Sequence, residues 1–182
     1  MRLTFLMVFV PAIFLGVGSA DADELLVSRA SFAGAIRDRE PAPALQSNQH
    51  SAPGSLWFWS EIRVDKNVMG ELRLKKRLPL QHRWYRNIAG TPGPDERPDF
   101  YRDLEEVDEK KIKAFAAAAE EQGFFMYRTS SCRVDLRAGR WTAKVTDARG
   151  NSLKCADGSR CRFEIVVDEG GQKALDICKL ER

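Results

Sequence analysis

Short segments with strand character, separated by loops rich in proline and glycine, constrain the fold of this chain most. Residues 56–64 (LWFWSEIRV) are rich in aromatic and β-branched side chains. The loops at 37–55 and 87–100 each contain three prolines. The further strand candidates are residues 24–36, 123–136, 139–147 and 161–180. Several short strands with turns between them predict a mainly β protein, an all-β sandwich.

The segment after the aromatic strand is expected to turn and to return as a second strand. Residues 65–71 (DKNVMGE) are typical of a turn, and apolar and polar residues alternate again over 72–86. Pro79 interrupts this alternation. Because proline cannot donate a hydrogen bond to a neighbouring strand, the ordered strand should begin near Leu80.

One α-helix is predicted over residues 103–122, inserted into the sandwich. The run from Glu105 to Gln122 consists almost wholly of strong helix formers. Gly123 is the expected C-terminal stop, and Asp103 or Asp108 is the expected N-terminal cap. The residues that share one apolar stripe are Leu104, Val107, Ile112, Phe115 and Ala119.

The N-terminal residues 1–22 have the pattern of a secretory signal peptide. Arg2 precedes an apolar run over residues 3–15, and Ala20-Asp21-Ala22 is a small-residue cleavage site. We therefore expect a single domain over residues 23–182, in the periplasm or secreted, and a retained N-terminal anchor is the alternative. No later segment approaches eighteen consecutive apolar residues, so no membrane span is expected after cleavage.

The charge of the chain argues against a nucleic-acid partner. Its formal net charge is +3, and removal of the leader takes away Arg2 and Asp21 together, so the balance does not change. This mild excess falls short of the concentrated basic patch of a nucleic-acid-binding protein.

Four cysteines lie in the last third of the chain: Cys132, Cys155, Cys161 and Cys178. An even number in an exported chain predicts two disulfides. The stretch CADGSRC contains turn chemistry between two of them, which favours Cys155–Cys161 and leaves Cys132–Cys178. No C-x-x-C motif occurs and no histidine is near in sequence, so neither a metal site nor another cofactor is expected.

Six fragments of the chain, taken together in their order, resemble a known bacterial family. They are VSRASF (27–32), IRDREP (36–41), LWFWSEI (56–62), HRWY (82–85), YRTSS (127–131) and GRWTAKVTDARGNSL (139–153). The family is catalogued as domain of unknown function 2914. The resemblance implies a small immunoglobulin-like β domain of exported or membrane-linked proteins, and it implies no activity. The chain departs from the family at 87–125, an enlarged helical insertion, and at 154–182, a cysteine-containing extension stapled by disulfides.

His82 and Arg83 are candidate site residues in the HRWY strand. Strand alternation places His82 and Trp84 on one face and Arg83 and Tyr85 on the other. General acid–base catalysis needs a histidine with an orienting partner, and the sequence contains no G-x-S-x-G elbow that would supply a nucleophile. We therefore interpret His82 as a hydrogen-bonded packing residue rather than a catalytic base.

Charged residues near the first two strands offer a second candidate. Arg37 and Arg39 can clamp a carboxylate through their guanidinium forks. The favoured interpretation is an ion-pair network that closes the loop, with Asp38 and Glu40 as adjacent partners. Glu61 is expected to pair with Arg83 across neighbouring strands.

Trp57 and Trp59 are the third candidate. If Phe58 faces the core, both tryptophans point outward and form a flat platform suited to a sugar ring or to the apolar face of a partner. The alternative is that the inserted helix covers them.

From these residues we expect a non-enzymatic periplasmic or secreted binding domain whose partner is an envelope protein or a glycan. The alternative is a cell-envelope hydrolase of peptidoglycan, glycan or ester substrates that uses Glu61, His82 or an acidic residue of the helix. The expected contact residues are Trp57, Trp59, Arg37, Arg39, Glu61, His82 and Arg83.

Overall fold

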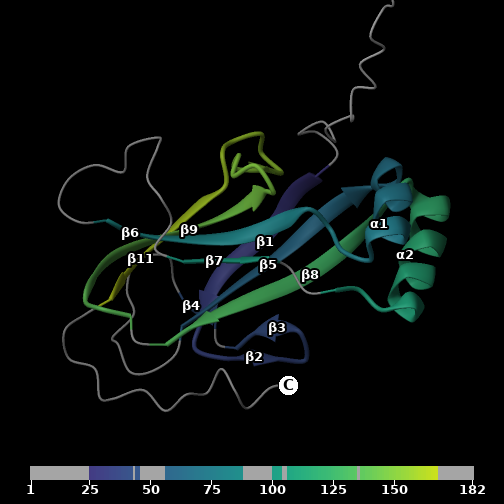
Figure 1. Cartoon of the computed structure of the whole chain (residues 1–182). Coiled ribbons are helices and arrows are strands. Elements are labelled where there is room, and N and C mark those ends of the chain that lie inside the picture. Colours follow the sequence, from purple (N-terminus) through teal and green to yellow (C-terminus); the bar gives the residue numbers. More distant parts are fainter. Residues whose placement is uncertain are drawn as a thin grey trace, which may run out of the picture.

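Two β-sheets form the body of the protein (Figure 1). The computed structural model describes residues 25–42, 44–45, 56–87, 100–103, 106–134 and 136–167. In the first sheet the strand order is β10-β1-β5-β8, with β4 paired to β1. Its strands are β1 (Leu25–Ala33), β4 (Ala44–Leu45), β5 (Leu56–Asp65), β8 (Phe124–Arg133) and β10 (Lys154–Cys155). All neighbours in it are antiparallel except β1 and β10.

The second sheet is antiparallel throughout and has the order β11-β9-β6-β7. Its strands are β6 (Leu80–Asn87), β7 (Phe100–Asp103), β9 (Gly139–Asp147) and β11 (Arg162–Val167). A separate two-stranded hairpin consists of β2 (Ile36–Arg37) and β3 (Glu40–Pro41).

Aromatic side chains from both sheets meet in a single core. Phe58 of β5 is fully buried, and its ring contacts those of Phe32, Trp84 and Phe163 at centroid distances of 5.4, 6.0 and 5.5 Å. Trp84 comes from β6 and is also fully buried, which confirms its expected packing role. Strand alternation therefore turns Phe58 and Trp84 toward each other and leaves the other face of each sheet outward.

Helical segments cover the end of the first sheet where β5 finishes and β8 begins (Figure 1). The segment η1 (Lys66–Val68) leads into α1 (Met69–Lys75), which lies beside α2 (Glu109–Gln122). Phe115 of α2 stacks on Phe125 of β8 at 4.6 Å between ring centroids. The apolar side chains that the helical segments bury in the core are Val68, Met69, Leu72, Ile112, Ala116 and Ala119.

The helix predicted over 103–122 begins later than expected. It starts at Glu109, because the Asp108 carboxylate accepts a hydrogen bond from the Lys111 N–H and caps the first turn. Gly123 ends it with a φ of 80°, as predicted. Asp103, the first residue of the predicted helix, is instead the last residue of the strand β7, which pairs with β6.

The helix α1 was not predicted, and the expectation of one helix is therefore wrong. The apolar residues of 72–86 were interpreted with a period of two. The buried residues Val68, Met69 and Leu72 instead follow the helical spacing of three and four. Leu80 does begin the strand β6, as Pro79 indicated.

The short strands β2, β3 and β4 lie within the stretch 37–55 that was expected to be a loop, with Ile36 beginning β2. The described part of the C-terminal extension also belongs to the sheets rather than standing apart, because β10 pairs with β1 and β11 with β9. The residues of the expected signal peptide lie outside the described part. Within the described residues, no helix is long and apolar enough to cross a membrane.

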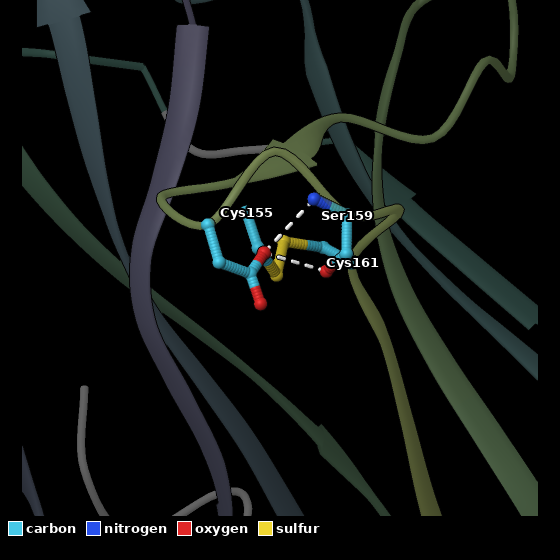
Figure 2. The surroundings of a disulfide bond; sticks show 4 residues. Cys155, Ser159 and Cys161 are labelled. Atoms are coloured by element: carbon cyan, nitrogen blue, oxygen red, sulfur yellow. Dashed lines mark hydrogen bonds between the residues drawn. A yellow bond between two sulfur atoms is a disulfide. The ribbon is translucent and has the colours of Figure 1, made fainter.

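The predicted disulfide between Cys155 and Cys161 is present (Figure 2). The turn that it closes contains Gly158 at a φ of 81°, and the Asp157 carboxylate accepts hydrogen bonds from the Ser159 N–H and hydroxyl at 2.9 and 2.6 Å. Cys132 is also disulfide-bonded. Cys178 lies outside the described residues, so the pairing Cys132–Cys178 stays a prediction.

Candidate functional site

Glu61 lies on the outward face of the first sheet and is held by two arginines. The pairing of the strands places Arg29 of β1 and Arg128 of β8 directly beside it. Arg29 Nε donates to Glu61 Oε1 at 2.9 Å, and Arg128 Nε donates to Oε2 at 2.7 Å. The side chain of Glu61 is only 8% exposed. Hydrogen bonds from Arg29, and then from Arg128, hold the pKa of Glu61 below its usual value against the opposing effect of burial.

Glu40 of the hairpin completes this set of charges. Its Oε1 lies 3.4 Å from Arg29 Nη2 and 3.0 Å from Arg128 Nη1. We call Arg29, Glu40, Glu61 and Arg128 the Glu61 cluster. Its two positive and two negative side chains balance, and they tie the β2–β3 hairpin to β1, β5 and β8. Glu40 therefore joins an ion-pair network, but its cations are Arg29 and Arg128. The predicted network of Arg37 and Arg39 with Asp38 and Glu40 is wrong, because none of the ion pairs among the described residues involves Arg37 or Arg39.

The turn of this hairpin is exposed and has an unusual backbone. Asp38 and Arg39 have φ values of 50° and 63°, the positive values of a type I′ turn, which normally favours Asn-Gly or Asp-Gly. The Trp59 Nε1–H donates to the Arg39 carbonyl at 2.8 Å. Arg37, Asp38 and Arg39, which we call the hairpin tip, are all exposed. The Trp59 indole thus holds a strained turn whose three charged side chains are exposed to solvent.

Trp57 and Trp59 do not form an exposed platform, contrary to the prediction. They are only 7% and 3% exposed. Alternation does place them on the outward face, but the hairpin lies over Trp59, and the Arg29 guanidinium lies 5.2 Å from its ring centroid. The alternative that the helix covers them also fails for Trp59, because α2 packs on β8 around Phe125.

His82 lies between the two sheets and is fully buried, so its expected place on a contact surface is wrong. Its Nε2 lies 2.9 Å from the Ser60 hydroxyl and its Nδ1 lies 3.0 Å from the Ser131 hydroxyl. Ser131 also accepts a hydrogen bond from the Trp84 indole at 3.0 Å. The interpretation of His82 as a hydrogen-bonded packing residue is confirmed, because a buried imidazole has to satisfy both nitrogens.

Arg83 does not pair with Glu61, and the predicted cross-strand pair is wrong. The two residues lie on different sheets. Arg83 Nε and Nη2 both donate to Gln81 Oε1, at 2.9 and 2.8 Å. Its guanidinium packs against Gly150 in the turn after β9, where a Cβ atom would stand 2.4 Å from Nη1. Arg83 therefore hydrogen-bonds within its own strand and packs against a turn of its own sheet.

Sequence reasoning missed Arg29 and Arg128, and it gave Glu40 the wrong partners. Each of the three lies in one of the fragments on which the predicted resemblance rests: VSRASF, IRDREP and YRTSS. LWFWSEI supplies Glu61. Four separated fragments thus meet in one ion-pair cluster, and HRWY, LWFWSEI and YRTSS meet again around His82.

The chain matches no protein-family model, and no curated protein shows significant similarity to it. The resemblance to domain of unknown function 2914 therefore stays a prediction. Within the part of the chain that the structure describes, no three His, Cys, Asp or Glu side chains gather in a way that suits a metal ion.

Proposed function

We propose that the protein is an exported, non-enzymatic binding domain whose contact surface is the hairpin tip. The observation that supports this proposal is the exposed turn at Asp38 and Arg39, which keeps a strained backbone without glycine. Such strain costs on the order of 1–3 kcal/mol per residue and persists where the surroundings impose it, often at binding sites. The Trp59 indole and the Glu61 cluster are those surroundings here.

The charges of the tip indicate the chemistry of the partner. Arg37 and Arg39 flank Asp38, and all three side chains are exposed. Guanidinium groups bind carboxylates through two parallel hydrogen bonds, so the tip suits an envelope protein or a glycan that presents carboxylates. Because the turn is already ordered, little conformational entropy is lost when a partner binds.

The state of Glu61 and His82 favours binding over hydrolysis. Both carboxylate oxygens of Glu61 accept hydrogen bonds from arginines. His82 is enclosed by Ser60, Ser131 and the aromatic core. A general acid or base has to reach its substrate, which these positions do not allow without rearrangement. Hydrolysis of peptidoglycan or of ester substrates by the purified protein, lost on His82→Gln, would favour the hydrolase instead.

The class of fold and the compartment belong to the same proposal. Two mainly antiparallel sheets around a shared aromatic core support an immunoglobulin-like β-sandwich. The pattern of residues 1–22 supports export. The intact mass of the protein from its native host should correspond to a chain that begins at Asp21 or Asp23. A mature chain that still carries Met1 would contradict the export assignment.

The decisive experiment replaces the tip without disturbing the hairpin. In the variant Arg37→Ala, Asp38→Asn, Arg39→Gly, the Asn-Gly pair suits the type I′ turn, so the melting temperature should be equal or higher. The variant should lose the partner that the wild type captures on chemical crosslinking in its native envelope. The matched control, Arg137→Ala with Arg140→Ala at the β8–β9 turn, should capture it normally. Capture of the same partner by the tip variant would overturn the proposal.

A further inference from the structure

Residues 66–77 (KNVMGELRLKKR) concentrate the positive charge of the chain. They contain five Lys or Arg and one Glu, a formal charge of +4, whereas the whole chain carries +3. The rest of the sequence is therefore close to neutral. The segment that forms η1 and α1 therefore carries a local excess of positive charge.

The packing of α1 exposes one apolar side chain among these cations. Met69 and Leu72 point into the core, at 6% and 0% exposure. Leu74 lies on the opposite side of α1 and is 83% exposed. Among the described residues it is the large hydrophobic residue that is exposed to solvent. Isolated surface leucines are common. This one, however, is followed and preceded by basic residues that are also exposed. We call Arg73, Leu74, Lys75, Lys76 and Arg77 the helical apex.

Two cations of the apex are left without a counter-charge. Lys75 pairs with Glu71 at 2.6 Å, and Lys76 pairs with Glu109 at 3.2 Å. No residue in the described part of the chain forms an ion pair with Arg73 or Arg77. These two guanidinium groups stand on either side of Leu74 in the sequence and are available to an external anion.

The backbone of the apex is fixed at its C-terminal end. Lys76 adopts a φ of 53°, and its N–H donates to the Leu72 carbonyl at 2.8 Å. The Lys76 carbonyl in turn accepts from the Val107 N–H at 2.6 Å, just before α2. Figure 1 shows α1 beside α2 at one end of the molecule, beyond the ends of the strands. The apex is therefore presented at that end in a defined conformation.

From this arrangement we infer that the helical apex binds the surface of a bilayer that contains anionic phospholipid. Leu74 enters the boundary between headgroups and acyl chains, and Arg73 and Arg77 bind phosphate groups while their methylene stems lie along the apolar layer. Each cation near an anionic bilayer raises the affinity roughly five-fold. The surface is separate from the hairpin tip, and this inference does not depend on the proposed function.

The composition of the apex favours a bilayer over a macromolecular partner. Residues 66–77 contain no aromatic side chain and three lysines. Protein interfaces are enriched in aromatic residues and depleted in lysine. A nucleic acid would engage the cations through its phosphates but would give the exposed Leu74 no apolar environment. An anionic bilayer can bind the cations through its phosphate groups and can also accommodate Leu74 in its apolar layer.

Vesicle cosedimentation with the chain that lacks the expected leader, residues 23–182, tests the inference. The wild type should bind vesicles of phosphatidylcholine and phosphatidylglycerol in equal parts, should not bind phosphatidylcholine alone, and should be released by high salt. Arg73→Glu with Arg77→Glu should weaken binding by about 100-fold or more. Leu74→Gln keeps the charge and should weaken binding by roughly 3- to 10-fold, the loss expected for partial burial of one side chain.

A matched charge reversal separates the apex from net charge. Arg137→Glu with Arg140→Glu changes the charge equally at the β8–β9 turn, the opposite end of β8 from the helices. This control should bind nearly as the wild type does. Equal losses in both double variants, or an unchanged affinity for Leu74→Gln, would overturn the inference. Binding of the wild type to soluble polyglutamate but to neither vesicle would assign the apex to an acidic protein instead.

Discussion

The Arg83 guanidinium occupies the space that a side chain on Gly150 would need. A Cβ atom at Gly150 would lie 2.4 Å from Arg83 Nη1, and Gly150 itself has a φ of 94°. The contact joins β6 to the turn after β9. In that turn the Asp147 carboxylate also accepts hydrogen bonds from the N–H groups of Arg149 and Asn151, each at 2.8 Å.

Gly150→Ala should therefore destabilise the protein more than a glycine replacement that meets only backbone strain. Gly158 also has a positive φ, and a Cβ there meets no atom within 4 Å, so Gly158→Ala is the control. We expect an additional loss of about 1 kcal/mol for Gly150→Ala, because Arg83 has to move away from Gln81. Denaturant unfolding of both variants measures it. The excess should disappear in an Arg83→Ala background, and its persistence there would contradict the explanation.

Glu61→Gln should lower the free energy of unfolding at neutral pH by about 1–3 kcal/mol, because two arginines lose a charged acceptor that is nearly buried. Arg29 and Arg128 stay partly exposed, at 54% and 42%, which keeps the loss below that of a fully buried pair. Glu164→Gln removes an acid from partly exposed ion pairs with Arg140 and Arg162 and should cost less than 1 kcal/mol.

The pH dependence of stability follows from the lowered pKa of Glu61. A carboxyl whose pKa is lower in the folded state contributes stability that is complete above its unfolded pKa of about 4.3. That contribution is lost as the pH falls through the lower, folded value. The difference in stability between the wild type and Glu61→Gln should be constant from about pH 6 to pH 8 and should shrink below about pH 4. A difference that grows in acid would contradict the assignment.

His82→Ala should cost about 2–4 kcal/mol, because it opens a cavity and leaves the Ser60 hydroxyl without its partner inside the core. The asymmetry of buried hydrogen bonds gives a sharper test. His82→Leu should be less destabilising when Ser60→Ala is also present, since the stranded hydroxyl is then removed. A double-mutant cycle by thermal unfolding measures this coupling, and strictly additive effects would argue against the network.

Trp59→Phe should loosen the hairpin while the fold persists. A phenyl ring keeps part of the packing, but the hydrogen bond to the Arg39 carbonyl is lost, at a cost of about 1 kcal/mol in addition to the lost contacts. Amide exchange at residues 36–42 should become faster than in the wild type, whereas exchange in β9 should not change. Unaltered exchange in the hairpin would mean that the Glu61 cluster alone holds the turn.

Non-reducing peptide mapping of the protein from its native host should recover Cys155 joined to Cys161 and Cys132 joined to Cys178. Loss of the shorter bridge through Cys155→Ser with Cys161→Ser should cost roughly 2 kcal/mol on the basis of loop entropy. Because Cys161 is fully buried, part of the cost will come from packing. Recovery of crossed peptides would contradict the pairing, and free thiols would contradict oxidation.

Strand positions were predictable here where one residue marked an end or where composition was one-sided. Pro79 gave the start of β6 at Leu80, and the aromatic run from Leu56 gave β5. The sequence did not predict that the β2–β3 hairpin covers the outward face of the first sheet at Trp59. Trp59 follows alternation and faces outward, yet a hairpin with only two residues in each strand covers it. A strand of two residues is too short to show an alternating sequence pattern. The hairpin is also held by ion pairs with Arg29 and Arg128, which are distant in sequence, so its position could not be predicted locally.

The parallel pairing of β1 with β10 has a consequence for the order in which the chain can fold. Leu26 and Val27 pair with Lys154 and Cys155, so this edge of β1 is completed only by residues near the other end of the sequence, whereas its other edge pairs with β5. Until those residues arrive, one edge of β1 presents unpaired backbone groups that can recruit another chain. Contacts of such sequence separation slow folding. A nascent or truncated chain that ends before residue 154 should therefore aggregate through its N-terminal strand and need a chaperone until synthesis is nearly complete.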